Sequence, residues 1–180
     1  MSVKIRKATT SDIDAINKIY ENIHTAEESA NASVGWVRGV YPTKGTAQEA
    51  LQRGDLFAEE YNGQIVGTVI LNHIQPDIYR AAQWQYDADD KNIMVMHTLA
   101  IDPCVKGHGF GRAFEEFYEE YAISHGCEFL RIDTNERNKN ARKFYKNAGY
   151  KEVSILPCDF NGIDNINLVI LEKKAQKGAV

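Results

Sequence analysis

The pattern of apolar and polar positions in the first half of the chain predicts a strand, a helix and a hairpin. Residues 3–7 read as a short strand, and the cluster from Thr9 to Asp12 precedes apolar residues at helical spacing, as a helix start does. Residues 56–61 and 64–72 are strand-like runs joined by Asn62-Gly63. This dipeptide is the one most typical of a tight β-hairpin.

The second half of the chain alternates strands with helices. Residues 93–101 are apolar apart from His97 and Thr98, which is typical of a central strand buried on both faces. The elements predicted after it are a helix that ends before Gly126, a strand at 129–134, a helix at 138–148, and strands at 150–155 and 166–172. This order predicts a mixed α/β sheet in which a glycine-rich loop and a helix make a right-handed parallel crossover.

Two segments show no clean periodicity. Residues 25–45 precede helical character at 46–51 and predict a mobile, aromatic loop. Residues 74–91 predict an irregular connection that is longer than usual, and long connections are often functional.

Composition narrows the class of protein. The chain has 180 residues, 43% of them hydrophobic and 26% charged, which predicts a single domain over residues 1–180. Three scattered cysteines predict plain thiols and no metal site. No apolar run approaches the ~20 residues of a membrane span, so we expect a soluble, cytoplasmic protein that does not enter membranes. The net charge of −4 argues against binding nucleic acid by phosphate neutralisation.

The most informative stretch is VKGHGFG, which connects the strand at 93–101 to the following helix. Main-chain N–H groups and the helix dipole at such a place favour a phosphate group. The ATP-type loop does not match, because Arg112 and Ala113 follow Gly111. The dinucleotide fingerprint matches poorly, since it would place Arg112 or Phe114 where a small residue is required. A third pattern, Q/R-x-x-G-x-G/A, matches Lys106, Gly109 and Gly111, with lysine in place of the Gln or Arg at its first position.

Two flanking stretches give this third pattern its context. LAIDP, at 99–103, precedes the loop, and NKNARKFYKNAGY, at 138–150, matches N-x-x-A-x-x-x-Y-x-x-x-G-F/Y. With these motifs the chain resembles the GCN5-related N-acetyltransferases, the GNAT family, over residues 5–172. The resemblance implies a mostly antiparallel central sheet with helices on both faces. It also implies that acetyl-CoA donates an acetyl group to a primary amine of a small molecule or peptide.

The resemblance assigns roles to particular residues. Leu99, Ala100 and Ile101 would bind the pantetheine arm through main-chain groups, as an added strand does. Asn138 would hydrogen-bond the cofactor arm, and Tyr145 would contact the cofactor and protonate the leaving thiolate. The alternative for Tyr145 is a core aromatic. The pyrophosphate would be bound by Lys106, Gly107, His108, Gly109, Phe110, Gly111 and Arg112.

The sequence does not decide which group removes a proton from the amine. His97 is the leading candidate, because it interrupts an apolar strand two residues before Leu99. The alternative is a core histidine. Glu59, Glu60 or Asp133 would instead act through water, although we expect Glu59 and Glu60 to be solvated.

The acceptor amine is not identified by these patterns. Trp36, Tyr41 and Trp84 lie in the two irregular segments, which border the acceptor groove in this family. They predict either a pocket for an apolar or cationic amine or lids packed on the domain. The alternative function is a non-catalytic CoA-binding sensor or assembly module, and we expect a monomer or homodimer.

Overall fold

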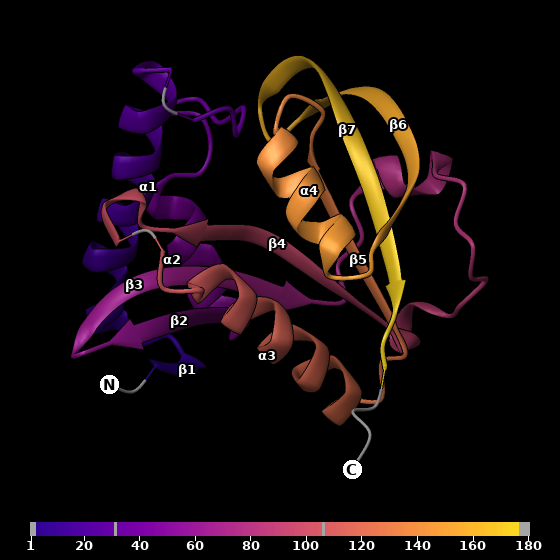
Figure 1. Ribbon diagram of the computed structural model, residues 1–180, viewed down its shortest axis with the longest axis horizontal. Helices are drawn as coiled ribbons and strands as arrows, with labels where there is room; N and C mark the ends of the chain where they lie inside the picture. The colour runs from indigo at the N-terminus through magenta and orange to yellow at the C-terminus, as the bar shows by residue number, and fades with distance from the viewer. Residues whose placement is uncertain (1–2, 31, 106, 177–180) are drawn as a thin grey trace.

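Seven strands form one sheet in the computed structural model, which describes residues 3–30, 32–105 and 107–176 (Figure 1). Neighbouring strands pair antiparallel except for β4 and β5, which run parallel. The expected mixed, mostly antiparallel sheet is confirmed. In sheet order the strands are β1 (Val3–Lys7), β2 (Leu56–Tyr61), β3 (Gln64–Asn72), β4 (Ile93–Ile101), β5 (Phe129–Asn135), β7 (Ile163–Lys174) and β6 (Lys151–Phe160).

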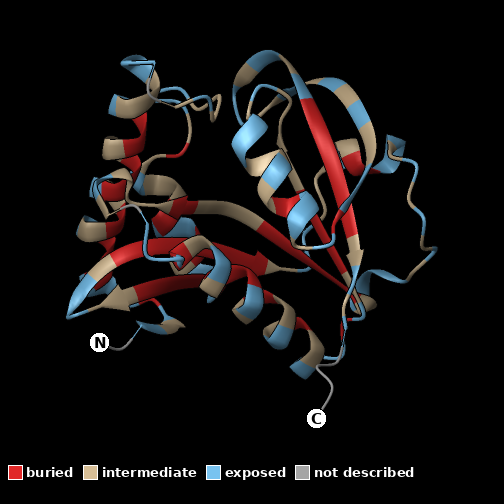
Figure 2. Ribbon diagram, in the orientation of Figure 1, coloured by how far each residue is buried: buried red, intermediate tan, exposed pale blue. Residues whose placement is uncertain are grey.

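Helices cover both faces of the sheet, as expected. Phe57 of β2 packs in a core cluster with residues of α3 and α4, whereas its neighbours Leu56 and Ala58 pack with α1 and α2. Successive side chains of a strand point to opposite faces, so these clusters lie on opposite sides of the sheet. Figure 2 shows the buried residues concentrated in the central strands between the two helical layers. The helices are α1 (Ile13–Glu28), α2 (Lys44–Arg53), α3 (Phe110–Ser124) and α4 (Lys139–Asn147).

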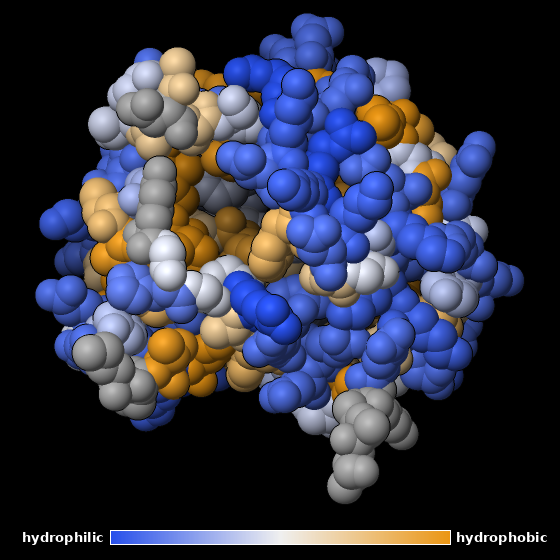
Figure 3. Space-filling model, viewed as in Figure 1, coloured by the Kyte–Doolittle hydropathy of each residue, from blue (hydrophilic) through white to orange (hydrophobic). Residues whose placement is uncertain are grey.

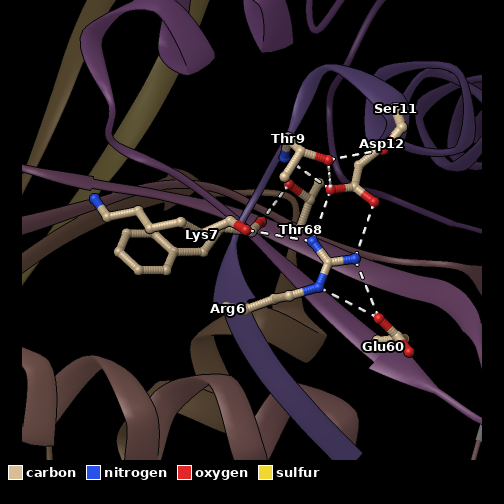
Figure 4. Close-up of polar contacts among 8 residues, drawn as sticks. Arg6, Lys7, Thr9, Ser11, Asp12, Glu60 and Thr68 are labelled. Carbon is tan, nitrogen blue, oxygen red and sulfur yellow. Dashed lines mark hydrogen bonds and ion pairs between the residues drawn. The ribbon is translucent and has the colours of Figure 1, made fainter.

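A charged cluster centred on Arg6 joins β1 to the start of α1 (Figure 4). Arg6 Nη1 lies 2.7 Å from Asp12 Oδ2, and Arg6 Nη2 lies 3.1 Å from Glu60 Oε2. The hydrogen bond from Arg6 is the main reason that the pKa of Asp12 falls to about 2. Glu60, one of the candidate proton acceptors, is therefore an ion-pair partner in this cluster.

The last two strands extend further than the sequence predicts. The hairpin at Asn62-Gly63 and the strand at 93–101 are confirmed. Strands β6 and β7, predicted at 150–155 and 166–172, continue to a second tight turn at Asn161-Gly162, with φ of 53° and 76°. The hairpin tip is mostly exposed and carries many polar residues, so it lacks the apolar pattern that marks residues 166–172.

The connection between β3 and β4 is irregular, as predicted, and is held against the sheet. Arg131 and Glu172 form a buried ion pair of 3.2 Å, with side chains 5% and 0% exposed. Gln85 N donates to Glu172 Oε2 at 3.0 Å, and Arg131 Nη2 donates to Tyr86 O at 3.4 Å. The ion pair thus anchors the connection.

Among the described residues, none of the helices is both long and apolar enough to cross a lipid bilayer.

Candidate active site

Strands β4 and β5 separate halfway along β4. Their parallel register ends at Met96 opposite Ile132. On the β3 side, the register of β4 is interrupted between His97 and Ala100, and Thr98 in this bulge has a φ of 52°. Bulges bend a strand and change the direction of its side chains, and they often occur beside active sites. The β4 edge that faces β5 beyond Met96 is therefore open to a ligand.

A cavity of about 730 Å³ occupies the gap between the separated strands. Figure 3 shows it as a hollow in the face of the molecule, between the α1 side and the α4 side. Its lining comes from both faces of the sheet, so the cavity passes through the sheet. On the α3 and α4 side it is lined by Leu99, Ile101, Gly111, Asn138, Phe144 and Tyr145. On the opposite side it is lined by Trp36, Tyr41, Asn72, His97, Asp133 and Ile166.

The structure brings five of the predicted cofactor residues to this cavity, namely Leu99, Ile101, Gly111, Asn138 and Tyr145. The Asn138 side chain also caps α4, because its Oδ1 accepts a hydrogen bond from Ala141 N at 3.1 Å. The side chain of Ala100 points to the other face and packs with α1 and α2. Lys106 lies outside the described residues.

The other predicted loop residues turn their side chains away from the cavity. The His108 ring stacks on Phe110, with ring centroids 5.4 Å apart, and Phe110 is buried. Arg112 is exposed and its Nε lies 2.8 Å from Glu116 Oε1. An anionic ligand at this loop would therefore meet main-chain groups, although Arg112 N already donates to Gly109 O at 3.0 Å.

The N-terminus of α3 fits a diphosphate. Gly109 occupies the N-cap position with a φ of 78°, which a residue without Cβ adopts at low cost. The first N–H groups of a helix have no partner within it, and the dipole of this 15-residue helix adds positive potential. A Cβ on Gly111 would meet only Phe144 Cζ, at 3.9 Å, so space for a ligand remains beside the first turn.

Replacing Gly111 with Leu is expected to weaken CoA binding at least ~10-fold, because the side chain would enter the space beside this first turn. The fold should persist, since the added Cβ meets only the edge of Phe144. Isothermal titration with CoA and thermal unfolding measure the two effects. Glu120→Leu, at an exposed position of the same helix, is the control. Unchanged CoA affinity in Gly111→Leu would contradict the anion site.

Tyr145 and Asp133 approach the cavity from opposite faces of the sheet. Burial is the main reason that the pKa of the Tyr145 phenol is raised, and the charge of Asp133 raises it further. Desolvation by the surrounding protein raises the pKa of Asp133 to about 6, although Tyr79 Oη donates a hydrogen bond to its Oδ2 at 2.9 Å. At pH 7 the cavity therefore holds a protonated phenol and an ionised carboxylate.

His97 is held in one tautomer by a residue that the sequence patterns did not single out. Asn72 Nδ2 donates to Asp55 Oδ2 at 2.8 Å, so Asn72 Oδ1 is an acceptor. His97 Nε2 lies 3.0 Å from this oxygen and hence carries the proton. Desolvation lowers the pKa of His97 to about 4, so the ring is neutral at pH 7. The signal for Asn72 in the sequence is its place as the polar residue directly after the apolar run 69–71.

Two of the three predicted acceptor aromatics line the cavity. Tyr41 is hydrogen-bonded through its hydroxyl to Thr98, and Trp36 packs edge-on against Tyr41 with ring centroids 6.2 Å apart. Trp84 lies elsewhere. Its ring centroid is 3.6 Å from the guanidinium carbon of Arg131, and its indole N–H donates to Tyr79 O at 2.9 Å. Its environment is that of a packing residue.

Glu59 is buried, so the expectation that it is solvated was wrong. Its side chain points to the α3 face opposite Gly67, which leaves room for the carboxyl group because it has no Cβ. Glu59 is 0% exposed, and neither carboxyl oxygen has a hydrogen-bond partner among the described residues. Burial raises its pKa to about 8, so Glu59 is mostly protonated at pH 7.

Comparison with known proteins decides the family. The sequence model of the Acetyltransferase (GNAT) family matches residues 18–150. The chain belongs to this family. It is 24% identical, over 153 residues, to an uncharacterized N-acetyltransferase of Methanocaldococcus jannaschii; the match covers 84% of this chain and 62% of that relative.

Solved structures of acetyltransferases share the fold. A GNAT-family acetyltransferase of Streptococcus agalactiae superposes with a TM-score of 0.78 at 20% identity, covering 97% of this chain and 96% of that one. The yncA protein of Salmonella typhimurium, solved with its cofactor acetyl-CoA, superposes with a TM-score of 0.68 at 14% identity. That match covers 100% of this chain and 98% of the other.

Proposed function

We propose that this GNAT protein transfers the acetyl group of acetyl-CoA to a primary amine of a small molecule or peptide. The observation that carries the proposal is the cavity between the separated strands β4 and β5, with Tyr145 on one side of the sheet and Asp133 on the other. Two reactants that enter from opposite faces would meet between these side chains. An acid for the leaving group and a base for the amine are the groups that acetyl transfer requires.

The donor side of the cavity suits CoA. The open edge of β4 at Leu99 and Ile101 offers main-chain groups to the amide-containing arm of the cofactor, and the N-terminus of α3 offers amides to its diphosphate. Acetyl-CoA supplies the acetyl group as a thioester. The Salmonella typhimurium neighbour, solved with acetyl-CoA, has the same fold and supports this assignment.

Tyr145 is proposed as the general acid. Its hydroxyl remains protonated at neutral pH, because burial raises the pKa of the phenol. A proton donor next to the leaving sulfur lowers the cost of forming a thiolate in a desolvated site. Tyr145 lies on the donor side of the cavity, where the sulfur would depart.

Asp133 is proposed as the group that receives the proton from the amine. An amine is cationic in water and must lose a proton before it attacks a carbonyl carbon. With a pKa of about 6, ionised Asp133 attracts the ammonium group and is a stronger base than His97, whose pKa is about 4. We therefore favour Asp133 over His97, the leading candidate from the sequence, and propose that neutral His97 forms part of the polar wall.

The acidic limb of the pH–rate profile tests this choice. We expect kcat/KM to fall below pH ~6, where Asp133 becomes protonated and loses both its charge and its basicity. Asp133→Asn should lower kcat/KM by ~10²-fold or more and remove this limb, whereas His97→Gln should leave the limb in place. A limb near pH 4 that disappears in His97→Gln would assign the base to His97.

A further inference from the structure

The charge distribution of the acceptor side restricts which amines it accepts. Among the described residues that line the cavity, the charged ones are Asp133, Glu49 and Arg53. Arg53 is already neutralised, because its Nε lies 3.0 Å from Asp55 Oδ2. In the described part of the lining, Asp133 and Glu49 can therefore attract a cationic group, and no cationic side chain is left unpaired for an anionic group.

The rest of the described lining on this side carries no charge: it combines uncharged polar side chains, such as Asn72 and His97, with a large apolar share. Trp36 and Tyr41 present aromatic rings, and the β6–β7 hairpin contributes side chains without charge. Burying an apolar group against such walls favours binding, whereas desolvating a charged group against them opposes binding. The apolar residues from the sheet and the hairpin are Ile70, Phe160, Ile163, Ile166 and Leu168.

The segment at 34–41 limits the length of the acceptor. It is fixed at separate points: Val34 N donates to Glu27 Oε2 at 2.7 Å, and the hydroxyl of Tyr41 bonds Thr98. Gly35 packs so closely that a Cβ on it would lie 2.5 Å from Asn135 Nδ2.

The same segment touches the tip of the β6–β7 hairpin, where a Cβ on Gly162 would lie 3.1 Å from Val40 Cγ1. Beyond it lies a second cavity of about 520 Å³, and the two cavities share walls at Gly35, Trp36 and Ile166. A polypeptide that continued past its amine in this direction would have to displace the segment.

We propose that the acceptor is a small primary monoamine with an apolar body and no anionic group. This proposal rests on the proposed acetyl transfer and narrows its acceptor. Asp133 binds the ammonium group, the aromatic and aliphatic walls cover the body, and the absence of an unpaired cation from the described lining disfavours amino acids and aminophosphonates.

Matched substrates test the proposal with the wild-type protein. 2-Phenylethylamine and L-phenylalanine share one skeleton and differ by a carboxylate, so kcat/KM should favour the amine by ~10²-fold or more. 2-Aminoethylphosphonate and a hexapeptide with a free amino terminus should be acetylated at least as poorly as L-phenylalanine. Comparable kcat/KM for 2-phenylethylamine and any of these would overturn the inference while leaving acetyl transfer in place. Transfer to none of these four amines would also overturn the inference, and acetyl transfer itself would then be decided by the wider amine panel described in the Discussion.

A variant tests the electrostatic reason. Asp55→Asn removes the carboxylate that neutralises Arg53 and should lower KM for L-phenylalanine, reducing the preference for 2-phenylethylamine several-fold. Thermal unfolding checks that the variant is folded. Gln52→Asn, at the exposed neighbouring position 52, serves as the control and should leave the preference unchanged. An unchanged preference in folded Asp55→Asn would contradict the proposed role of the paired arginine.

Discussion

Replacing Tyr145 with Phe is expected to lower kcat by ~10²- to 10⁴-fold, the usual contribution of a general acid, while CoA affinity changes little. The change keeps the ring and its packing and removes only the proton donor. Affinity for CoA should persist, because we propose that the N-terminus of α3 and the open edge of β4 supply it. Steady-state kinetics and calorimetric titration with CoA measure the two quantities separately.

The same cluster provides a matched control. Tyr150 packs edge-on against Tyr145 with ring centroids 5.6 Å apart, but its hydroxyl is buried and does not line the cavity. Tyr150→Phe removes an identical atom from the core and should leave kcat within a few-fold of the native value. Equal rates for the native protein and Tyr145→Phe would exclude Tyr145 as the acid.

Replacing Arg131 with Met is expected to cost ~3–5 kcal/mol of unfolding free energy, because it leaves the carboxylate of Glu172 buried without its partner. The change also removes the guanidinium that bonds Tyr86 O and lies under the Trp84 ring, so the connection at 74–91 should loosen. Urea unfolding measures the loss, and hydrogen exchange at 74–91 measures the loosening.

Arg142→Met is the control for this effect. Arg142 and Glu152 also form a close ion pair, of 2.7 Å, but their side chains are 28% and 33% exposed. A pair screened by solvent contributes only ~0–1 kcal/mol. Adding Glu172→Met to Arg131→Met should restore part of the stability by removing the orphaned charge. A loss in Arg131→Met no larger than in Arg142→Met would contradict the anchoring role.

Elements specified by local chemistry were predictable from the sequence. Asn62-Gly63 identified its hairpin, because both residues of a tight turn adopt positive φ, here 51° and 78°. Asn161-Gly162 carries the same signal, but polar residues surround it, so the apolar pattern predicts the last two strands too short. The separation of β4 from β5 depends on how segments far apart in the sequence pair. The spacing of apolar residues within one segment carries no information about such pairing.

The site residues also divide into those that a local sequence pattern identifies and those that only the three-dimensional structure identifies. The glycine loop is visible in the sequence because its pattern lies within one crossover, and the proposed role of Tyr145 comes from the resemblance of 138–150 to the family motif. Glu59 was expected to be solvated because carboxylates usually are, but its side chain falls on the same face of β2 as buried Phe57. Asp133 and His97 were both named as bases, and only the three-dimensional surroundings separate their pKa values, about 6 and about 4.

Acetyl transfer itself is tested most directly by incubating the purified protein with acetyl-CoA and a panel of primary amines, and detecting products by mass. The account predicts an N-acetylated amine formed in equal amount to the released CoA thiol, with the rates of both lowered together by ~10²-fold or more in Asp133→Asn. Binding of CoA without an acetylated product from any amine would contradict it and would favour a CoA-binding sensor or assembly module.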